Sequence, residues 1–197
     1  RIDVLINNAG YGQMGALEDV PMDAGRRQLE VNLIGPARLI QLCLPHMRKQ
    51  KFGKIINISS VGGKFSSPLG GWYHASKFAL EGYSDALRME VRPFGIDVVV
   101  IEPGGTESEW ASIAADQANR YSGKGAYADL VRRSFGSALR QRKMPPPQEI
   151  TDLVMKALRA RQPRTRYHGG LGAGPVLFLR RMLSDKMFDR LILSQLG

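Results

Sequence analysis

The chain has 197 residues, of which 43% are hydrophobic and 23% are charged, a balance typical of one globular domain with a sizeable core. This composition excludes a disordered, collagen-like or low-complexity chain, and the lone Cys43 excludes an intramolecular disulfide framework. The net charge is +10, with −1 over residues 1–119 and +11 over residues 120–197.

Three short apolar runs, at residues 4–6, 55–58 and 96–101, predict buried parallel strands, because they are rich in β-branched residues and bounded by turn signals. The segments between them, about 23–50 and 73–91, have the apolar spacing of helices. This alternation predicts a βαβαβ unit with right-handed crossovers and helices on both faces of the sheet. The fold class is therefore α/β, with a doubly wound parallel sheet.

The rest of the chain is expected to complete a single domain over residues 1–197. Residues 105–146 are small, polar and basic, which predicts an irregular insertion that serves as a substrate loop. A helix is predicted over 148–161 and a short strand over 165–168. Residues 176–196 predict one amphipathic helix that covers the core, packs on a partner subunit or lies on a membrane, with packing favoured.

The location of the protein and its macromolecular partners follow mainly from charge and from missing signals. The basic C-terminal part has the charge to attract nucleic acid, an anionic membrane or a phosphorylated ligand. No aromatic-basic motif accompanies that charge, which favours a solvated face and no nucleic-acid partner. The sequence shows no transmembrane segment, no leader peptide and no Cys/His cluster, so we expect a cytoplasmic protein without a metal site.

Tyr73 and Lys77 carry the strongest chemical signal. Their spacing of four places both side chains on one face of the second predicted helix, and Ser60 stands 13 residues before Tyr73. With this YxxxK pattern and upstream serine, the chain resembles the short-chain dehydrogenase/reductase family. The resemblance continues over roughly residues 3–110, in Asn7-Asn8-Ala9-Gly10 after the first strand, Asn32 in the first helix and Pro103-Gly104 after the third strand.

The resemblance implies a Rossmann-like oxidoreductase that moves a hydride between NAD(P) and a carbonyl or secondary alcohol substrate. Tyr73 would be the proton donor, since a nearby ammonium and an oxidised nicotinamide ring should lower its pKa. Lys77 would supply that ammonium and hold the nicotinamide ribose. Ser60 would orient the substrate oxygen and stabilise developing alkoxide charge.

Asn32 is interpreted through the residues that follow it. Pro36 lacks the N–H that would bond to the Asn32 carbonyl in a regular helix, so that carbonyl is expected to be free. The family position implies that it holds a water linking Lys77 to solvent as a proton relay. The alternative is a simple kink whose carbonyl is solvated.

Two other segments are expected to contact the cofactor. Asn8, Ala9 and Gly10 follow a strand end, where open α/β sheets bind ligands, and the resemblance places them along the adenosine side. Pro103 and Gly104 would allow close approach of the nicotinamide. Ser108 stands where the family often has Thr in a PGxxxT pattern, so it would contact the carboxamide. The sequence does not separate NAD from NADP.

The family begins with a strand, a TGxxxGxG turn and a helix that holds the pyrophosphate, and none of these is present. The chain opens at what corresponds to the fourth strand, so we expect the first βαβ portion to be missing. The alternative function is therefore a non-catalytic Rossmann-like fragment or assembly module. The resemblance also implies a homo-oligomer, a dimer or tetramer, paired through the two long helices.

The C-terminal segment, with its basic-apolar helix after Arg164-Thr165-Arg166-Tyr167, resembles the branch related to 17β-hydroxysteroid and retinol dehydrogenases. That likeness implies a lipophilic substrate. The aromatic and methionine residues near the proposed site could line its pocket, although such residues are more often core: Tyr11, Met14, Phe65, Trp72 and Trp110. The three histidines, His46, His74 and His168, are expected to be structural.

Overall fold

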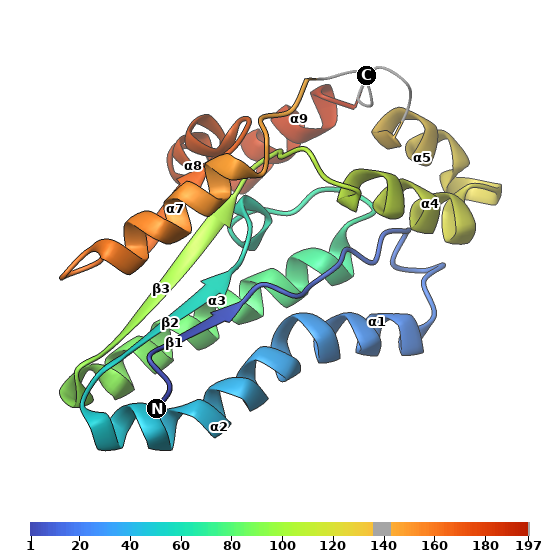
Figure 1. Cartoon of the computed structure of the whole chain (residues 1–197). Coiled ribbons are helices and arrows are strands. Elements are labelled where there is room, and N and C mark those ends of the chain that lie inside the picture. The colour runs from blue at the N-terminus through green and yellow to red at the C-terminus, as the bar shows by residue number, and fades with distance from the viewer. Residues whose placement is uncertain (136–142, 197) are drawn as a thin grey trace.

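The computed structural model describes residues 1–135 and 143–196 and contains one parallel sheet (Figure 1). Its strands lie side by side in chain order: β1 (Val4–Asn7), β2 (Gly53–Ile58), β3 (Ile96–Pro103) and β4 (Arg166–Gly169). All three pairings are parallel, as the alternating pattern predicts.

The two long helical stretches lie close to their predicted bounds. The first consists of α1 (Met22–Leu29), a π-helical segment (Glu30–Ile34) and α2 (Gly35–Gln50). The second is α3 (Gly71–Val91), which ends before Pro93 because proline disfavours helix in the residue that precedes it.

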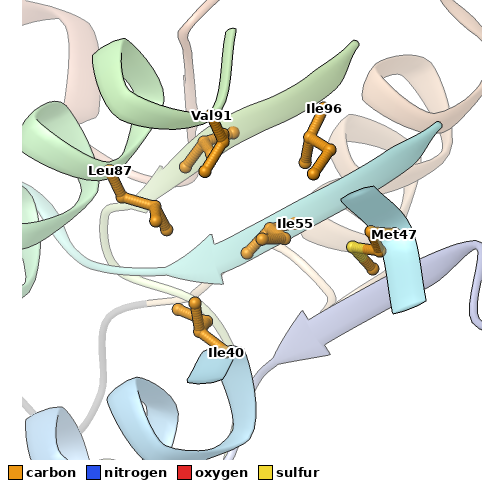
Figure 2. Packing of buried hydrophobic residues seen from close by; sticks show 7 residues of the cluster. Ile40, Met47, Ile55, Leu87, Val91 and Ile96 are labelled. Atoms are coloured by element: carbon orange, nitrogen blue, oxygen red, sulfur yellow. The ribbon is translucent and has the colours of Figure 1, made fainter. Parts of the chain in front are cut away.

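Both stretches pack on the same face of the sheet (Figure 2). The shared core joins buried side chains from α2, α3 and the strands: Ile40, Met47, Ile55, Leu87, Val91, Ile96 and Val98. Successive strands are added in one direction, so crossovers of one hand place their helices on one side. The two crossovers between β1, β2 and β3 therefore cover one face of the sheet.

The opposite face is covered by α7 (Gln148–Arg159). Ile56 and Val99, which alternate with the side chains of the first core, pack there against Ala157. Helices thus cover both faces, and the β3-to-β4 connection has the opposite hand to the first two. The prediction that β1 is buried is wrong on this face, where Val4 is 40% exposed and Ile6 43%. These side chains are exposed because α7 packs on β3 and β4.

Most of residues 110–135 are helical, within the segment 105–146 where an irregular insertion is predicted. They form α4 (Trp110–Ser122) and α5 (Ala128–Phe135), joined by a short 3₁₀ turn, and residues 136–142 of that prediction lie outside the described residues. The helices pack through Ala114 and Ala118, which are small residues that give no strong apolar pattern. No described helix is long and apolar enough to cross a membrane.

The C-terminal segment contains two helices instead of the single helix predicted over 176–196. They are α8 (Ala173–Met182) and α9 (Asp185–Ser194). Leu183 and Ser184 between them have extended backbone, with ψ of 144° and 161°. Ser184 is the N-cap residue of α9 and Asp185 follows in its first turn, a sequence typical of a helix start.

Candidate active site

The carboxyl ends of β1, β2 and β3 bring three loops to one edge of the sheet. These loops are residues 8–10, 59–64 and 104–108. The N-terminal turns of α3 lie against the second loop and carry Tyr73 and Lys77. Most of the predicted site residues therefore gather where parallel sheets bind their ligands.

Ser60 lies at the centre of these loops. Its Oγ accepts a hydrogen bond from the Gly62 N–H at 3.0 Å and donates to the Pro103 carbonyl at 3.4 Å. The same hydroxyl proton has the side chain of Tyr73 as its alternative partner. Ser60 thus caps the short 3₁₀ turn Val61–Gly63 and joins the ends of β2 and β3 to α3.

The pKa of Tyr73 is raised above its ordinary value of 10.0, because burial disfavours the phenolate more than the Ser60 hydrogen bond stabilises it. The expected lowering by the Lys77 ammonium is not found in this structure. Lys77 Nζ lies 6.0 Å from the centre of the Tyr73 ring and donates to the Ile58 carbonyl at 2.8 Å.

Lys77 is itself buried, which lowers its pKa from 10.5 to about 8, while the negative charge of Glu81 opposes the shift. An ammonium has three donors, and the bond to Ile58 uses one of them. Gly10 lies beside it, since a Cβ at Gly10 would be 3.8 Å from Lys77 Nζ and 3.1 Å from Asn32 Oδ1. The glycine therefore keeps the space next to the ammonium free.

Asn32 lies in the π-helical segment, directly before Gly35 and Pro36, so the predicted disturbance of the helix is confirmed. Its side-chain amide donates to the Tyr11 carbonyl at 3.0 Å and to Ser76 Oγ at 3.1 Å, and its Oδ1 accepts from the Tyr11 N–H at 3.2 Å. The side chain thus anchors the loop after β1, and the main-chain carbonyl is the group that the predicted relay would use.

The remaining predicted cofactor residues differ in their surroundings. Asn8 and Ala9 are exposed at the end of β1. Gly104 packs against the turn after β4, because a Cβ there would be 2.6 Å from the Leu171 carbonyl oxygen. Ser108 is exposed, and its hydroxyl accepts from the Trp110 N–H at 3.4 Å, close to the start of α4.

Two of the predicted pocket residues border Tyr73. The Trp110 ring lies 5.2 Å from the Tyr73 ring, centre to centre and tilted by 56°. Met14 belongs to the buried cluster on which Tyr73 packs. Phe65 instead contacts α9, and Trp72 packs over α1, so their positions are explained by packing between helices.

His74 has a structural role, as predicted. Its Nε2 accepts from the Ser67 N–H at 3.1 Å, so Nδ1 carries the proton and donates to the Gly62 carbonyl at 2.8 Å. Burial lowers its pKa, which keeps the ring neutral. The imidazole thereby fixes the loop after Ser60 to α3, a contact that the sequence alone does not reveal.

Sequence reasoning also missed a cluster of charged side chains beneath this loop. We call it the buried charge cluster, and its members are Lys64, Glu81, Asp85, Glu102 and Arg166. Burial and the neighbouring Glu81 raise the pKa of Glu102 to about 7. The sequence signal that could have revealed the cluster is Glu102, a carboxylate near the end of the apolar strand β3.

Comparison with known proteins agrees with this geometry. The family model described as short chain dehydrogenase matches residues 1–119. The probable short-chain type dehydrogenase/reductase VdlC of Helicobacter pylori is 36% identical over 189 residues, which cover 96% of this chain and 69% of the relative. The 3-ketodihydrosphingosine reductase of Bacteroides thetaiotaomicron is 52% identical over 104 residues, covering 53% of this chain and 39% of that protein.

Two solved structures extend the comparison. A short-chain dehydrogenase from Streptomyces avermitilis has a TM-score of 0.75 and 33% identity, covering 90% of this chain and 64% of its own. A metagenomic short-chain oxidoreductase in complex with NADP has a TM-score of 0.51 and 38% identity, covering 53% of this chain and 48% of its own. The chain therefore belongs to the short-chain dehydrogenase family.

Proposed function

We propose that the protein is an NAD(P)-dependent oxidoreductase that transfers a hydride between a nicotinamide cofactor and a carbonyl or secondary alcohol substrate. The observation that carries this proposal is the meeting of Ser60, Tyr73 and Lys77 at the carboxyl edge of the sheet. A tyrosine hydroxyl bonded to a serine, with an ammonium one helical turn away, has the groups needed to donate a proton to a carbonyl oxygen.

The residues present fit the nicotinamide half of such a cofactor. Lys77 has donors to spare, and Gly10 leaves space beside them, which suits contact with ribose hydroxyls. Asn8 and Ala9 would line the adenosine side, while Pro103, Gly104 and Ser108 would border the nicotinamide. The bound cofactor would supply the hydride. The NADP complex of the metagenomic relative supports a nicotinamide cofactor without choosing between NAD and NADP.

In the direction of reduction, Tyr73 would give its proton to the substrate oxygen. Its raised pKa keeps the hydroxyl protonated at neutral pH before the cofactor binds. Ser60 would hold the same oxygen, and Lys77 would stabilise the phenolate left behind. A water on the Asn32 carbonyl would then return a proton through Lys77, as the family position implies.

We propose a lipophilic substrate for this site. Met14 and Trp110 give the surroundings of Tyr73 an apolar character, and the Bacteroides relative is named a 3-ketodihydrosphingosine reductase. The branch of 17β-hydroxysteroid and retinol dehydrogenases remains a prediction of the same kind. The alternative is a non-catalytic assembly module, which would retain the fold without turnover.

A turnover assay on the full-length protein separates these functions. The reduced cofactors NADH and NADPH are offered with a small ketone, a 17-ketosteroid and 3-ketodihydrosphingosine, and cofactor absorbance is followed. We expect turnover with at least one pair, and a loss of about 100-fold or more in Tyr73→Phe. Tyr83→Phe, on the same helix, is the matched control and should remain active. Folded protein that binds cofactor but turns over none of these ketones would favour the assembly module.

A further inference from the structure

The buried charge cluster connects four parts of the molecule. Glu81, on α3, has a side chain only 5% exposed, and its Oε2 lies 2.7 Å from Lys64 Nζ and 2.9 Å from Arg166 Nη2. Glu102, at the end of β3, is 4% exposed and lies 3.7 Å from Lys64 and 3.2 Å from Arg166. Asp85 pairs with the same Arg166 at 2.8 Å.

Glu81 holds the loop that carries Ser60. Lys64 is the residue directly after the 3₁₀ turn capped by Ser60, so its ion pair attaches the end of that turn to α3. The contact leaves no room for a side chain at Gly63. A Cβ there would lie 2.9 Å from Ser59 Oγ, 3.0 Å from Glu81 Cγ and 3.2 Å from the Lys77 carbonyl oxygen.

Glu81 also acts on Lys77 through its charge. The two residues are four apart on α3, the spacing at which helical side chains are neighbours. Burial favours the neutral amine of Lys77, and Glu81 is the charged group that opposes this effect. The Ile58 carbonyl, the hydrogen-bond partner of Lys77 among the described residues, carries no net charge.

We infer that Glu81 is a positioning residue of the active site: its carboxylate, one helical turn from Lys77, favours the ammonium form of that side chain, and its ion pair with Lys64 holds the Ser60 loop on α3. The expected effect on turnover rests on the proposed function. The effects of Glu81 on Lys77 and on Lys64 do not depend on it, because they involve only residues of this chain.

Several charged groups face Glu81 and enter any pH dependence. Lys64 comes from the loop after β2, Arg166 from β4 and Glu102 from β3, while Lys77 and Asp85 share α3 with Glu81. Glu102 titrates near neutrality, with a pKa of about 7, so its protonation must be separated from that of Lys77. The measurement therefore has to report on the Lys77 ammonium itself.

The test is an NMR titration of the full-length protein with ¹³C at the lysine Cε, in which Lys77→Met assigns the Lys77 signal. Glu81→Gln removes the charge and retains the shape of the side chain. It should lower the titration midpoint of Lys77 by about one pH unit. Glu81→Asp retains the charge and should restore most of the wild-type midpoint. Glu90→Gln, an exposed glutamate on the same helix, is the matched control and should leave it unchanged.

A Lys77 midpoint that is the same in wild type and Glu81→Gln would overturn the electrostatic part, whatever the turnover. A midpoint that falls in a protein without turnover would support it and reject the proposed function instead. Should Glu81→Gln not fold, Lys64→Met removes the same ion pair from its more exposed side. Lys64→Met should lower kcat about tenfold, with rescue by Lys64→Arg, and unchanged kcat in Lys64→Met would overturn the positioning of the Ser60 loop.

Discussion

Single side chains at this site are governed by burial and by the bonds that oppose it. Tyr73 and Lys77 are both pushed toward their neutral forms, since burial raises the pKa of the phenol and lowers that of the amine to about 8. Lys77 alone therefore does not lower the pKa of Tyr73 below its ordinary value. The positive charge of an oxidised nicotinamide ring would have to supply the rest.

His74 should make the stability of the protein depend on pH. Its pKa in the folded state lies below the ordinary 6.5, so the unfolded chain binds the proton more readily. The contribution of His74 is therefore complete above about pH 6.5 and is lost as the pH falls through the folded-state pKa. We expect the melting temperature of His74→Gln to fall less than that of wild type between about pH 7 and about pH 5.

Thermal unfolding of both proteins at several pH values measures this difference. His46→Gln is the matched control, because His46 is exposed and should change nothing. If the melting temperatures of wild type and His74→Gln fall in parallel as the pH is lowered, the neutral imidazole does not hold the loop.

At this scale the sequence predicts well what depends on local spacing. Tyr73 and Lys77 share a helix face because four residues make about one turn, and Ser60 follows from the family pattern. The partnership of Lys64 with Glu81 could not be predicted, since it joins residues 17 positions apart through the course of a loop. The contact of Gly104 with Leu171 likewise depends on how β4 is placed.

Among the described helices, the stretch that carries Asn32 has a clear distortion, to which we assign the proposed relay. Its π-helical segment lies between α1 and α2, at the point where Pro36 lacks a donor. We expect Pro36→Ala to restore that donor, favour a regular helix and close the water site on the Asn32 carbonyl. Proton exchange should then be slower, with a changed pH–rate profile and little change in cofactor affinity.

A crystal structure and the pH–rate profile of Pro36→Ala in the full-length protein check this prediction. In wild type, a water should lie within about 3 Å of the Asn32 carbonyl oxygen and lead toward Lys77. A wild-type carbonyl that is bonded within the helix, with no such water, would remove the relay but leave the chemistry of Tyr73 intact.

The core between α2, α3 and the sheet should dominate the stability of these elements. Ile55 is fully buried there at 0% exposure, so Ile55→Ala should lower the free energy of unfolding by about 2–5 kcal/mol. Ile113, on α4, is largely exposed, and Ile113→Ala should change it by no more than about 0.5 kcal/mol. Urea unfolding measures both, and equal losses would mean that the core lies elsewhere.

Elements whose packing uses large apolar residues were predictable, and others were not. The strands and the two long helices stand out by their periodicity, whereas α4 buries alanines that leave no such pattern. The break between α8 and α9 is marked only by Ser184 and Asp185, a start signal inside an otherwise continuous amphipathic run.

For the whole molecule, the outer surfaces of α2 and α3 suggest how copies associate. Leu39 and Leu42 on α2 and Phe78 on α3 are exposed, and the family resemblance implies pairing through these helices. We propose a symmetric dimer or tetramer of the full-length protein. Light scattering should show an oligomer at micromolar concentration, and Leu42→Asp should dissociate it. A wild-type monomer would contradict this proposal.

For the whole molecule, the sequence predicts which elements form but not which face of the sheet each helix covers. Parallel strands and intervening helices follow from the pattern, but which face each helix covers depends on strand order. The β3-to-β4 connection returns over the opposite face, and the sequence has no mark for that choice.

We propose above that Tyr73 donates the proton that accompanies hydride transfer. The most direct measurement offers the full-length protein a reduced cofactor carrying deuterium on the nicotinamide ring, together with a ketone that the wild type consumes. Deuterium should appear on the substrate carbinol carbon in wild type. It should appear at least about 100-fold more slowly in Tyr73→Phe with cofactor bound. Near-wild-type deuterium transfer by folded Tyr73→Phe would contradict the account.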